Sequence, residues 1–196
     1  MSDGLTAFVF MALCRPGTIG AILPSSQRLA EAMARAAHGC SALIELGAGT
    51  GSITAALRRH HQDVPLRVVE LQARLAQHLR QRFPEVEVCQ APAHQVLAGA
   101  HGGPPGLVLV SSLPFRSLPP RLRLRSSLAI ERLLCERPDS RLVQYSYQPR
   151  EPFALRHAGQ LAWRRLDTVW GNAPPAWVWE LRRPPAHGMP ASAASA

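Results

Sequence analysis

Three glycines at alternating positions, Gly47, Gly49 and Gly51, constrain the fold of this chain more than any other feature. They follow the apolar run Ala42-Leu43-Ile44, which is typical of a buried strand, and they precede a plausible helix start at residues 52–57. A strand that turns sharply into a helix needs residues without a Cβ, so that its backbone can approach a ligand. The helix N-terminus then offers unpaired N–H groups and a partial positive charge. The pattern therefore predicts a strand, a ligand-binding turn and a helix.

Two acidic residues sharpen this prediction. Glu45 stands at the end of the strand, where an apolar residue is expected if the strand served only the core. Glu70 ends the next apolar run. Its distance along the chain is close to the spacing of about 20 residues at which the carboxylate of a second strand receives the ribose hydroxyls of a nucleoside cofactor. The turn is neither a G-x-G-x-x-G dinucleotide fingerprint nor a phosphate loop, because the third glycine comes too early and no Gly-Lys-Ser/Thr follows.

The motif E-L-G-A-G-T-G with its later acid resembles that of the class I S-adenosylmethionine-dependent methyltransferases. In that family the glycine turn cradles the methionine part of the cofactor, and the acid after strand 2 holds the ribose. The resemblance implies S-adenosylmethionine as the cofactor. It also implies an α/β, Rossmann-like fold, with a mostly parallel seven-stranded sheet, an antiparallel end strand and helices on both faces. The residues that it assigns to the cofactor are Glu45, Gly47, Ala48, Gly49, Thr50, Gly51, Glu70, Leu71, Gln90, Ala91 and Ser111.

Hydrophobic periodicity and turn residues predict the other elements of this fold. We expect helices over residues 26–37, 51–60, 72–82 and 118–136. We expect further strands over residues 66–70, 86–89, 107–110, 141–147, 161–169 and 176–181, the last two forming the antiparallel end of the sheet.

The N-terminal part of the chain carries a second resemblance. The almost uniformly apolar stretch from Gly4 to Cys14 predicts a helix that either packs in the core or lies in a membrane interface. The segment R-P-G-T-I-G-A-I-L-P-S-S follows, and with the glycine motif it resembles the small bacterial phospholipid N-methyltransferases, a likeness that extends to about residue 182. These enzymes methylate the amine of phosphatidylethanolamine at the membrane surface. We expect a helical segment over residues 1–40, a methyltransferase domain over 41–182 and a disordered tail over 183–196.

Two positions depart from the methyltransferase pattern. After the third strand the family often carries an acid that receives the adenine amino group, whereas this chain has Gln90-Ala91-Pro92. Gln90 or a backbone carbonyl would have to accept that bond. After the fourth strand the related RNA and DNA adenine methyltransferases carry N-L-P-Y or N-P-P-Y, and here Ser112 replaces the Asn and Phe115 the Tyr. A site built for two-point hydrogen bonding loses selectivity without its polar partner, so the sequence favours a small amine head group over a nucleobase.

Methyl transfer to an amine requires a neutral nucleophile. A free primary amine has a pKa near the ~10.4 of lysine and arrives protonated, but no His or Asp stands in a motif typical of a base. Tyr145 and Tyr147 either accept a hydrogen bond from the amine, flank the methylated ammonium with their ring faces or pack as strand aromatics. The candidate catalytic residues are therefore Tyr145, Tyr147 and Ser112.

The chain is strongly basic, with a net charge of +9 and with arginine as all 22 of its basic residues. This excess indicates either a coding bias or an affinity for anionic surfaces. Arg116, Arg121, Arg123 and Arg125 cluster near the start of the last predicted helix, either as solvated charges or as a phosphate-binding rim. We expect a phospholipid substrate and an anionic membrane surface as partners, with nucleic acid as the second candidate and no metal.

The scattered cysteines, Cys14, Cys40, Cys89 and Cys135, form no metal-binding pair and indicate a reducing compartment. The acidic start and the short apolar runs argue against export and against a membrane span. We therefore expect a cytoplasmic protein associated peripherally with the inner face of the membrane. Two alternatives stay open: a relative of the rRNA adenine dimethyltransferases, and a non-catalytic membrane- or RNA-binding protein on the same fold.

Overall fold

The computed structural model describes residues 24–100, 102–172 and 174–184. The predicted helix over 4–14 lies outside the described residues, and so does the predicted disordered tail from residue 185 onward. The expectations for both segments therefore stay predictions, as does the domain boundary near residue 40.

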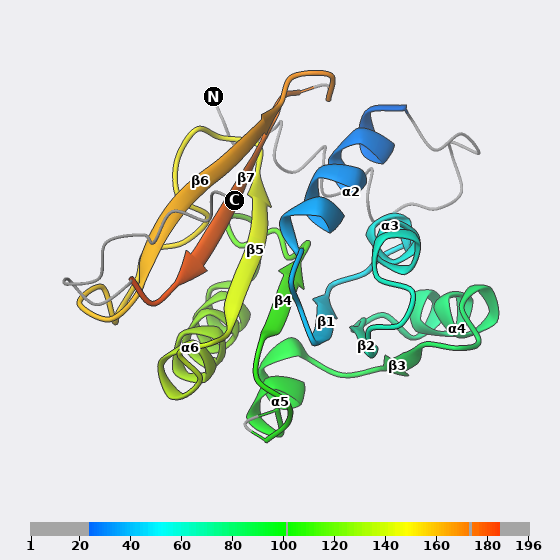
Figure 1. Ribbon diagram of the computed structural model, residues 1–196, viewed down its shortest axis with the longest axis horizontal. Helices are drawn as coiled ribbons and strands as arrows, with labels where there is room; N and C mark the ends of the chain where they lie inside the picture. The colour runs from blue at the N-terminus through cyan, green and yellow to red at the C-terminus, as the bar shows by residue number, and fades with distance from the viewer. Residues whose placement is uncertain (1–23, 101, 173, 185–196) are drawn as a thin grey trace, which may run out of the picture.

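In the described part of the chain, seven strands form one sheet in the order β3-β2-β1-β4-β5-β7-β6 (Figure 1). Strands β1 to β5 pair in parallel, and β7 runs antiparallel between β5 and β6. This confirms the predicted α/β fold, in which a mostly parallel sheet has antiparallel pairing at one end. The strands are β1 (Ala42–Leu46), β2 (Leu66–Val69), β3 (Glu87–Cys89), β4 (Leu107–Ser111), β5 (Arg141–Ser146), β6 (Ala162–Val169) and β7 (Ala176–Arg182).

Burial of the strands decreases from the centre of the sheet to its edge. All five residues of β4 are buried, and β1 beside it is buried from Leu43 onward. On the edge strand β6 only Val169 is buried. Strands covered by helices on both faces appear in a sequence as continuous apolar runs, which is why β1 and β4 were the clearest predictions.

Helices cover both faces of this sheet (Figure 1). On one face Met33, Leu57 and Leu79 belong to a single buried cluster that joins the first three helices to the strands. On the other face Leu97 and Ile130 belong to a second cluster beneath the last two helices. The helices are α2 (Pro24–Ala36), α3 (Ser52–His60), α4 (Ala73–Arg82), α5 (Ala93–Ala98) and α6 (Pro120–Glu136).

Most predicted ranges agree with the observed ones to within about two residues, but helix α5 was not predicted. The segment after Gln90 was expected to be a loop. Instead, Pro92 caps a helix of six residues, A-H-Q-V-L-A. Fewer than two helical turns carry too little periodicity to be recognised in a sequence, and their stability comes from packing, here through Ala93 and Leu97.

Parallel strands end at a common edge of the sheet. The segments after β1, β2, β4 and β5 therefore meet at this edge, which we call the carboxyl edge. Helix α2 packs against α3 and also contacts β5, β6 and β7, so it covers one face of the sheet over these three strands. Ligands of open α/β sheets bind at such an edge, where the strand order reverses between β1 and β4.

Candidate functional site

The glycine turn lies at the carboxyl edge between β1 and α3. Gly47, Gly49 and Gly51 have positive φ angles of 75°, 58° and 84°, a region that other residues rarely adopt. The sequence-based prediction of a sharp strand-to-helix turn at these residues therefore agrees with the backbone.

The three glycines differ in how much room a side chain would have at each position. A Cβ at Gly47 would lie 2.9 Å from Leu113 Cδ2, and one at Gly51 would lie 2.7 Å from Phe83 Cε2. A Cβ at Gly49 would have no heavy atom within 4 Å. The outer two glycines thus allow close packing inside the protein, whereas the middle one faces open space that a ligand can occupy.

Glu70 fastens this turn to the end of β2. The side chain is buried, and its Oε2 accepts a hydrogen bond of 2.9 Å from Gly49 N, while its Oε1 accepts one of 2.9 Å from Gln72 N. A carboxylate has about four lone-pair sites, so Glu70 keeps acceptor capacity after these two bonds. It lies where the sequence predicted a ribose-binding acid, beside the glycine turn.

Glu45 is a fully buried acid at the end of β1. Thr54 Oγ1 of α3 donates a 2.6 Å hydrogen bond to its Oε2, while Oε1 has no partner among the described residues. Burial raises the pKa of Glu45 to about 7; the hydrogen bond from Thr54 opposes the shift, and the charge of Glu70 adds to it. A buried carboxylate with a free oxygen is the arrangement that a positively charged ligand group would complete.

The side chain after Glu70 is unusually exposed for its type. Leu71 has 53% of its surface accessible, while Ala91 nearby in the β3 segment is half-buried and Gln90 is exposed. Glu70 N donates to Cys89 O at 3.1 Å, which holds the ends of β2 and β3 together. An exposed apolar side chain beside Glu70 offers a surface on which a planar ring can pack. The predicted cofactor-binding roles of Gln90 and Ala91 stay predictions.

The segment after β4, residues 112–119, is the β4 loop, and it is pinned next to the glycine turn. Ser112 N donates to Leu46 O at 2.9 Å, and the buried Ser111 accepts a 3.2 Å bond at Oγ from Leu113 N. Thr50 of the turn is exposed and Ala48 is buried. The structure thus brings Ser111 and Ser112 to the turn, as the sequence predicted, although their roles stay predictions.

Phe115 points away from any ligand at this edge. It is 2% exposed, and its ring lies 4.5 Å from that of Phe153, which in turn meets Trp163 edge-on at 5.1 Å. This stack joins the β4 loop to residues 147–161, the β5 loop. Phe115 is therefore a packing residue, and its ring has no free face on which a base could stack.

Gln144 is a site residue that the sequence analysis did not single out. It pairs in register with Ser111, is buried, and donates from Nε2 to Leu113 O at 3.2 Å and to Tyr145 O at 2.9 Å. Its Oε1 has no partner among the described residues. The available signal was a single amide in the otherwise apolar core of a strand, Leu142-Val143-Gln144.

Tyr145 and Tyr147 lie on the opposite face of β5 from Gln144. Their rings are 5.4 Å apart in an edge-on arrangement, and both pack against the cluster that contains α2. Burial raises the pKa of Tyr145, and the neighbouring Tyr147 adds to the shift; burial likewise raises the pKa of Tyr147. Both phenols therefore stay neutral near pH 7, and their catalytic role stays a prediction.

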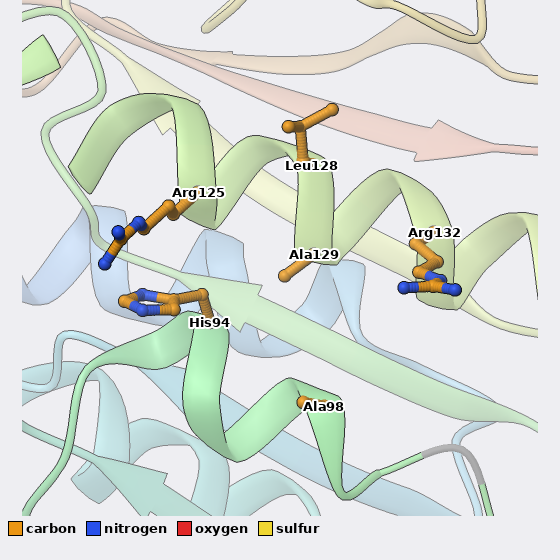
Figure 2. A pocket seen from close by; sticks show the side chains of 6 residues that line it. All are labelled: His94, Ala98, Arg125, Leu128, Ala129 and Arg132. Carbon is orange, nitrogen blue, oxygen red and sulfur yellow. The ribbon is translucent and has the colours of Figure 1, made fainter. Parts of the chain in front are cut away.

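A groove of about 390 Å³ lies between α5 and α6 (Figure 2). Arg125 extends toward His94 at one end, and Arg132 lies at the other. The remaining lining residues are Ala98, Leu128 and Ala129. No residue of the glycine turn lines this groove, so it is separate from the site at the carboxyl edge.

The described ranges hold no cluster of three His, Cys, Asp or Glu side chains placed to bind a metal ion. Within the same ranges, none of the helices has the length and apolar character that crossing a bilayer requires.

No family model matches the chain, and no curated protein matches it significantly. A TehB-like SAM-dependent methyltransferase from Corynebacterium glutamicum has a similar structure, with a TM-score of 0.58 at 15% identity over 92% of this chain and 97% of that one. The 23S rRNA methyltransferase ErmE gives 0.53 at 19% identity over 80% and 68%. The mitomycin 7-O-methyltransferase MmcR gives 0.56 at 18% identity over 82% and 54%. The chain therefore has the fold of the class I S-adenosylmethionine-dependent methyltransferases.

Proposed function

We propose that this protein is an S-adenosylmethionine-dependent methyltransferase that transfers methyl groups to the amine of phosphatidylethanolamine. The observation that carries the first part is the pair of buried carboxylates at the glycine turn. Glu70 fastens Gly49 to the end of β2, and Glu45 keeps an unpartnered buried oxygen. A turn used only for packing has no need of a buried acid whose ionisation is costly.

The residues at the turn fit this cofactor in charge and in space. The unpartnered Oε1 of Glu45 lies buried beneath the turn and favours a cationic group such as the α-ammonium above it, and the open side of Gly49 admits the amino-acid chain. Glu70 retains acceptor capacity for ribose hydroxyls, and the exposed Leu71 offers an apolar surface to adenine. When bound, the cofactor supplies a methyl group on an already activated sulfonium, so the protein has mainly to orient the acceptor.

The β4 loop supports a small amine as the methyl acceptor. The Ser112 hydroxyl is a hydrogen-bonding group beside the turn, and the loop around it is held in shape by Leu113 O, which accepts from Gln144 Nε2 at 3.2 Å and from Phe115 N at 2.9 Å. Phe115 is withdrawn into the core, so the aromatic platform that a nucleobase would use is missing. The neutral Tyr145 and Tyr147 serve as ring faces for a methylated ammonium, not as bases, because burial raises the pKa of both.

This function places the protein in the cytoplasm, at the inner face of a membrane that contains its substrate. The arginine excess supports the location, because an anionic lipid surface attracts a chain with a net charge of +9.

The test is methyl transfer from labelled S-adenosylmethionine to vesicles of phosphatidylethanolamine and phosphatidylglycerol. We expect labelled mono- or dimethylated lipid from the wild-type chain and none from a Glu70→Ala variant. A calorimetric titration with S-adenosylmethionine accompanies it. Cofactor binding without lipid methylation in any lipid mixture would refute the substrate and leave the cofactor assignment standing. No cofactor binding would refute the methyltransferase itself and favour a non-catalytic binding protein.

A second candidate is a methyltransferase that acts on rRNA. The similarity to the structure of ErmE, named as a 23S rRNA methyltransferase, favours it. The burial of Phe115 and the serine at position 112 weigh against it. Labelled methyl in rRNA but not in lipid would reverse the ranking.

A further inference from the structure

Three arginines at the carboxyl edge have no acidic partner among the described residues. Arg116 belongs to the β4 loop, Arg123 to the first turns of α6 and Arg150 to the β5 loop, and all three are exposed. The contact of Phe115 with Phe153 at 4.5 Å brings the two loops together and with them Arg116 and Arg150. Partial burial lowers the pKa of Arg116, and the charges of Arg150 and Arg123 lower it further, as expected of cations that face one another.

Several arginines elsewhere on the surface are paired with acids. Arg67 contacts Glu87 at 2.8 Å, Arg132 contacts Glu136 at 3.1 Å, and Arg164 contacts Glu180 at 2.9 Å. The sequence grouped Arg116, Arg121 and Arg123 with Arg125, but Arg125 turns toward His94 in the groove between α5 and α6 (Figure 2). Arg116, Arg123 and Arg150 thus form a group of neighbouring cations, which flanks the loop that carries Ser112.

An exposed tryptophan stands at the same edge of the sheet. Strand β6 runs in the same direction as β5, since both pair antiparallel to β7, so its end at Val169 lies at the carboxyl edge. Trp170 follows it and is 75% exposed. The buried Asn172 beside it donates from Nδ2 to Pro174 O at 2.7 Å and from its backbone N to Val169 O at 3.3 Å. The bond between Asn172 and Val169 spans Trp170, which is therefore presented at the end of β6.

We propose that the carboxyl edge is the face with which this protein docks on an anionic bilayer. In this arrangement Arg116, Arg123 and Arg150 bind lipid phosphates, and Trp170 enters the headgroup region. Guanidinium groups suit phosphate oxygens, and indole rings prefer the membrane–water interface, where one end of the ring is apolar and the other is hydrated. The inference rests on the proposed function in taking lipid as the anion, and it would bring a lipid amine to the β4 loop.

The docking surface can be tested without any methylation assay. The full chain is sedimented with phosphatidylcholine vesicles that do or do not contain phosphatidylglycerol. We expect binding only to the anionic vesicles and about a hundred-fold weaker binding for R116Q/R123Q/R150Q, since each arginine near such a surface contributes about five-fold. The matched control R35Q/R132Q/R165Q removes the same charge from residues away from this edge and should bind within about three-fold of the wild type. Trp170→Ala should bind several-fold more weakly than wild type.

Each other outcome counts against the docking face. Equal losses in both triple variants would mean that net charge alone drives binding, and full binding by R116Q/R123Q/R150Q would place the surface elsewhere. Tight binding to an RNA hairpin without binding to vesicles would assign the arginines to nucleic acid. A normal thermal shift with S-adenosylhomocysteine verifies that each variant is folded. Vesicle binding that follows the expected pattern, with no methylated lipid, would sustain the docking face and refute the proposed substrate.

Discussion

The two halves of the carboxyl edge differ in how their polar groups are satisfied. In the β1–β2 half, both oxygens of Glu70 accept backbone hydrogen bonds and Glu45 is held by a bond from α3. In the β4–β5 half, Arg116 and Arg150 have no acidic partner among the described residues. Each half keeps one buried oxygen without a partner, Glu45 Oε1 in the first and Gln144 Oε1 in the second. The glycine turn of the first half is fastened by Glu70 before any ligand arrives, whereas the second half also presents unpaired cations.

This difference fits what we propose that each half recognises. A cofactor shared by many enzymes demands the same turn and the same acids, so the β1–β2 half can be recognised from one sequence. A substrate is read by loops on a common scaffold, and loops vary with the substrate. The β1–β2 half therefore indicates the type of reaction, methyl transfer. The identity of the substrate has to be inferred from the β4–β5 half.

The largest expected effect is the loss of cofactor binding in Glu70→Ala. Removing this carboxylate deletes one acceptor of Gly49 N, one acceptor of Gln72 N and the acceptor that we propose for the ribose hydroxyls. Hydrogen bonds to a charged group contribute about 1.5–3 kcal/mol each, so affinity for S-adenosylmethionine should fall by more than about a hundred-fold. Calorimetric titration measures this loss. Glu87→Ala, which removes an exposed acid from neighbouring β3, should bind normally, and a similar affinity for both variants would contradict the role of Glu70.

The buried acid Glu45 predicts an unusual pH dependence of stability. Its pKa is raised by burial to about 7, so the folded protein binds this proton more tightly than the unfolded chain does. The resulting stabilisation is complete below about pH 4.5 and is lost as the pH rises through about 7. Above pH ~8, Glu45→Gln should therefore raise the free energy of unfolding of the ligand-free protein by about 3 kcal/mol, while weakening cofactor binding.

Urea denaturation at about pH 4.5 and pH 8.5 measures the effect of Glu45→Gln. The variant and the wild type should agree at the lower pH and separate at the higher one. Glu85→Gln, at an exposed position, serves as the control and should follow the wild type throughout. If the difference in free energy of unfolding between Glu45→Gln and the wild type were the same at both pH values, Glu45 would not be the group that binds the proton in the folded protein.

Three glycine substitutions distinguish the effect of backbone strain from that of a steric clash inside the protein and from that of blocking the space for the ligand. Gly51→Ala and Gly39→Ala each place a Cβ at positive φ, but only at Gly51 would it lie within 3 Å of other atoms, those of Phe83 and Leu79. We expect Gly51→Ala to lower the free energy of unfolding by about 2 kcal/mol more than Gly39→Ala does. Gly49→Ala, which meets open space, should match Gly39→Ala in stability yet lose cofactor affinity. Denaturation and calorimetry test both statements, and normal binding by Gly49→Ala would show that the cofactor lies elsewhere.

Sequence alone predicted the backbone of the glycine turn and the position of Glu70 in the β1–β2 half, while their binding roles stay predictions. Gly47, Gly49 and Gly51 adopt the backbone that a sharp turn needs, and Glu70 lies beside them, because spacing in parallel αβ units fixes which strand ends meet. The hydrogen bonds by which Glu70 holds the turn were not predicted, because the spacing of a residue along the chain does not reveal its hydrogen-bond partners.

The β4–β5 half was harder to predict because its contacts join segments far apart in the chain. Arg150 comes near Arg116 because Phe153 packs on Phe115 and so joins the two loops. Helix α5 is too short for periodicity to reveal. Gln144 matters through the register that places it opposite Ser111, and register is set by tertiary pairing.

The smallest expected effect belongs to this half and tests whether Gln144 orients the substrate. Gln144→Leu removes the donor to Leu113 O together with an oxygen that has no partner, so the free energy of unfolding should change by less than about 1 kcal/mol. Cofactor affinity should be unchanged, because Gln144 lies outside the β1–β2 half. The rate of methyl transfer at saturating lipid should fall about ten-fold, the equivalent of one hydrogen bond in the transition state.

The matched substitution for Gln144→Leu is Ser127→Ala, which removes a buried hydroxyl bonded only within α6, to Leu124 O at 3.1 Å. It should leave both the cofactor affinity and the transfer rate as they are. A Gln144→Leu enzyme that transfers methyl groups at the wild-type rate would show that the Leu113 carbonyl needs no fixed orientation. A loss of cofactor affinity in Gln144→Leu would instead break the division between the two halves, because a change confined to β5 would have reached the glycine turn through Leu113.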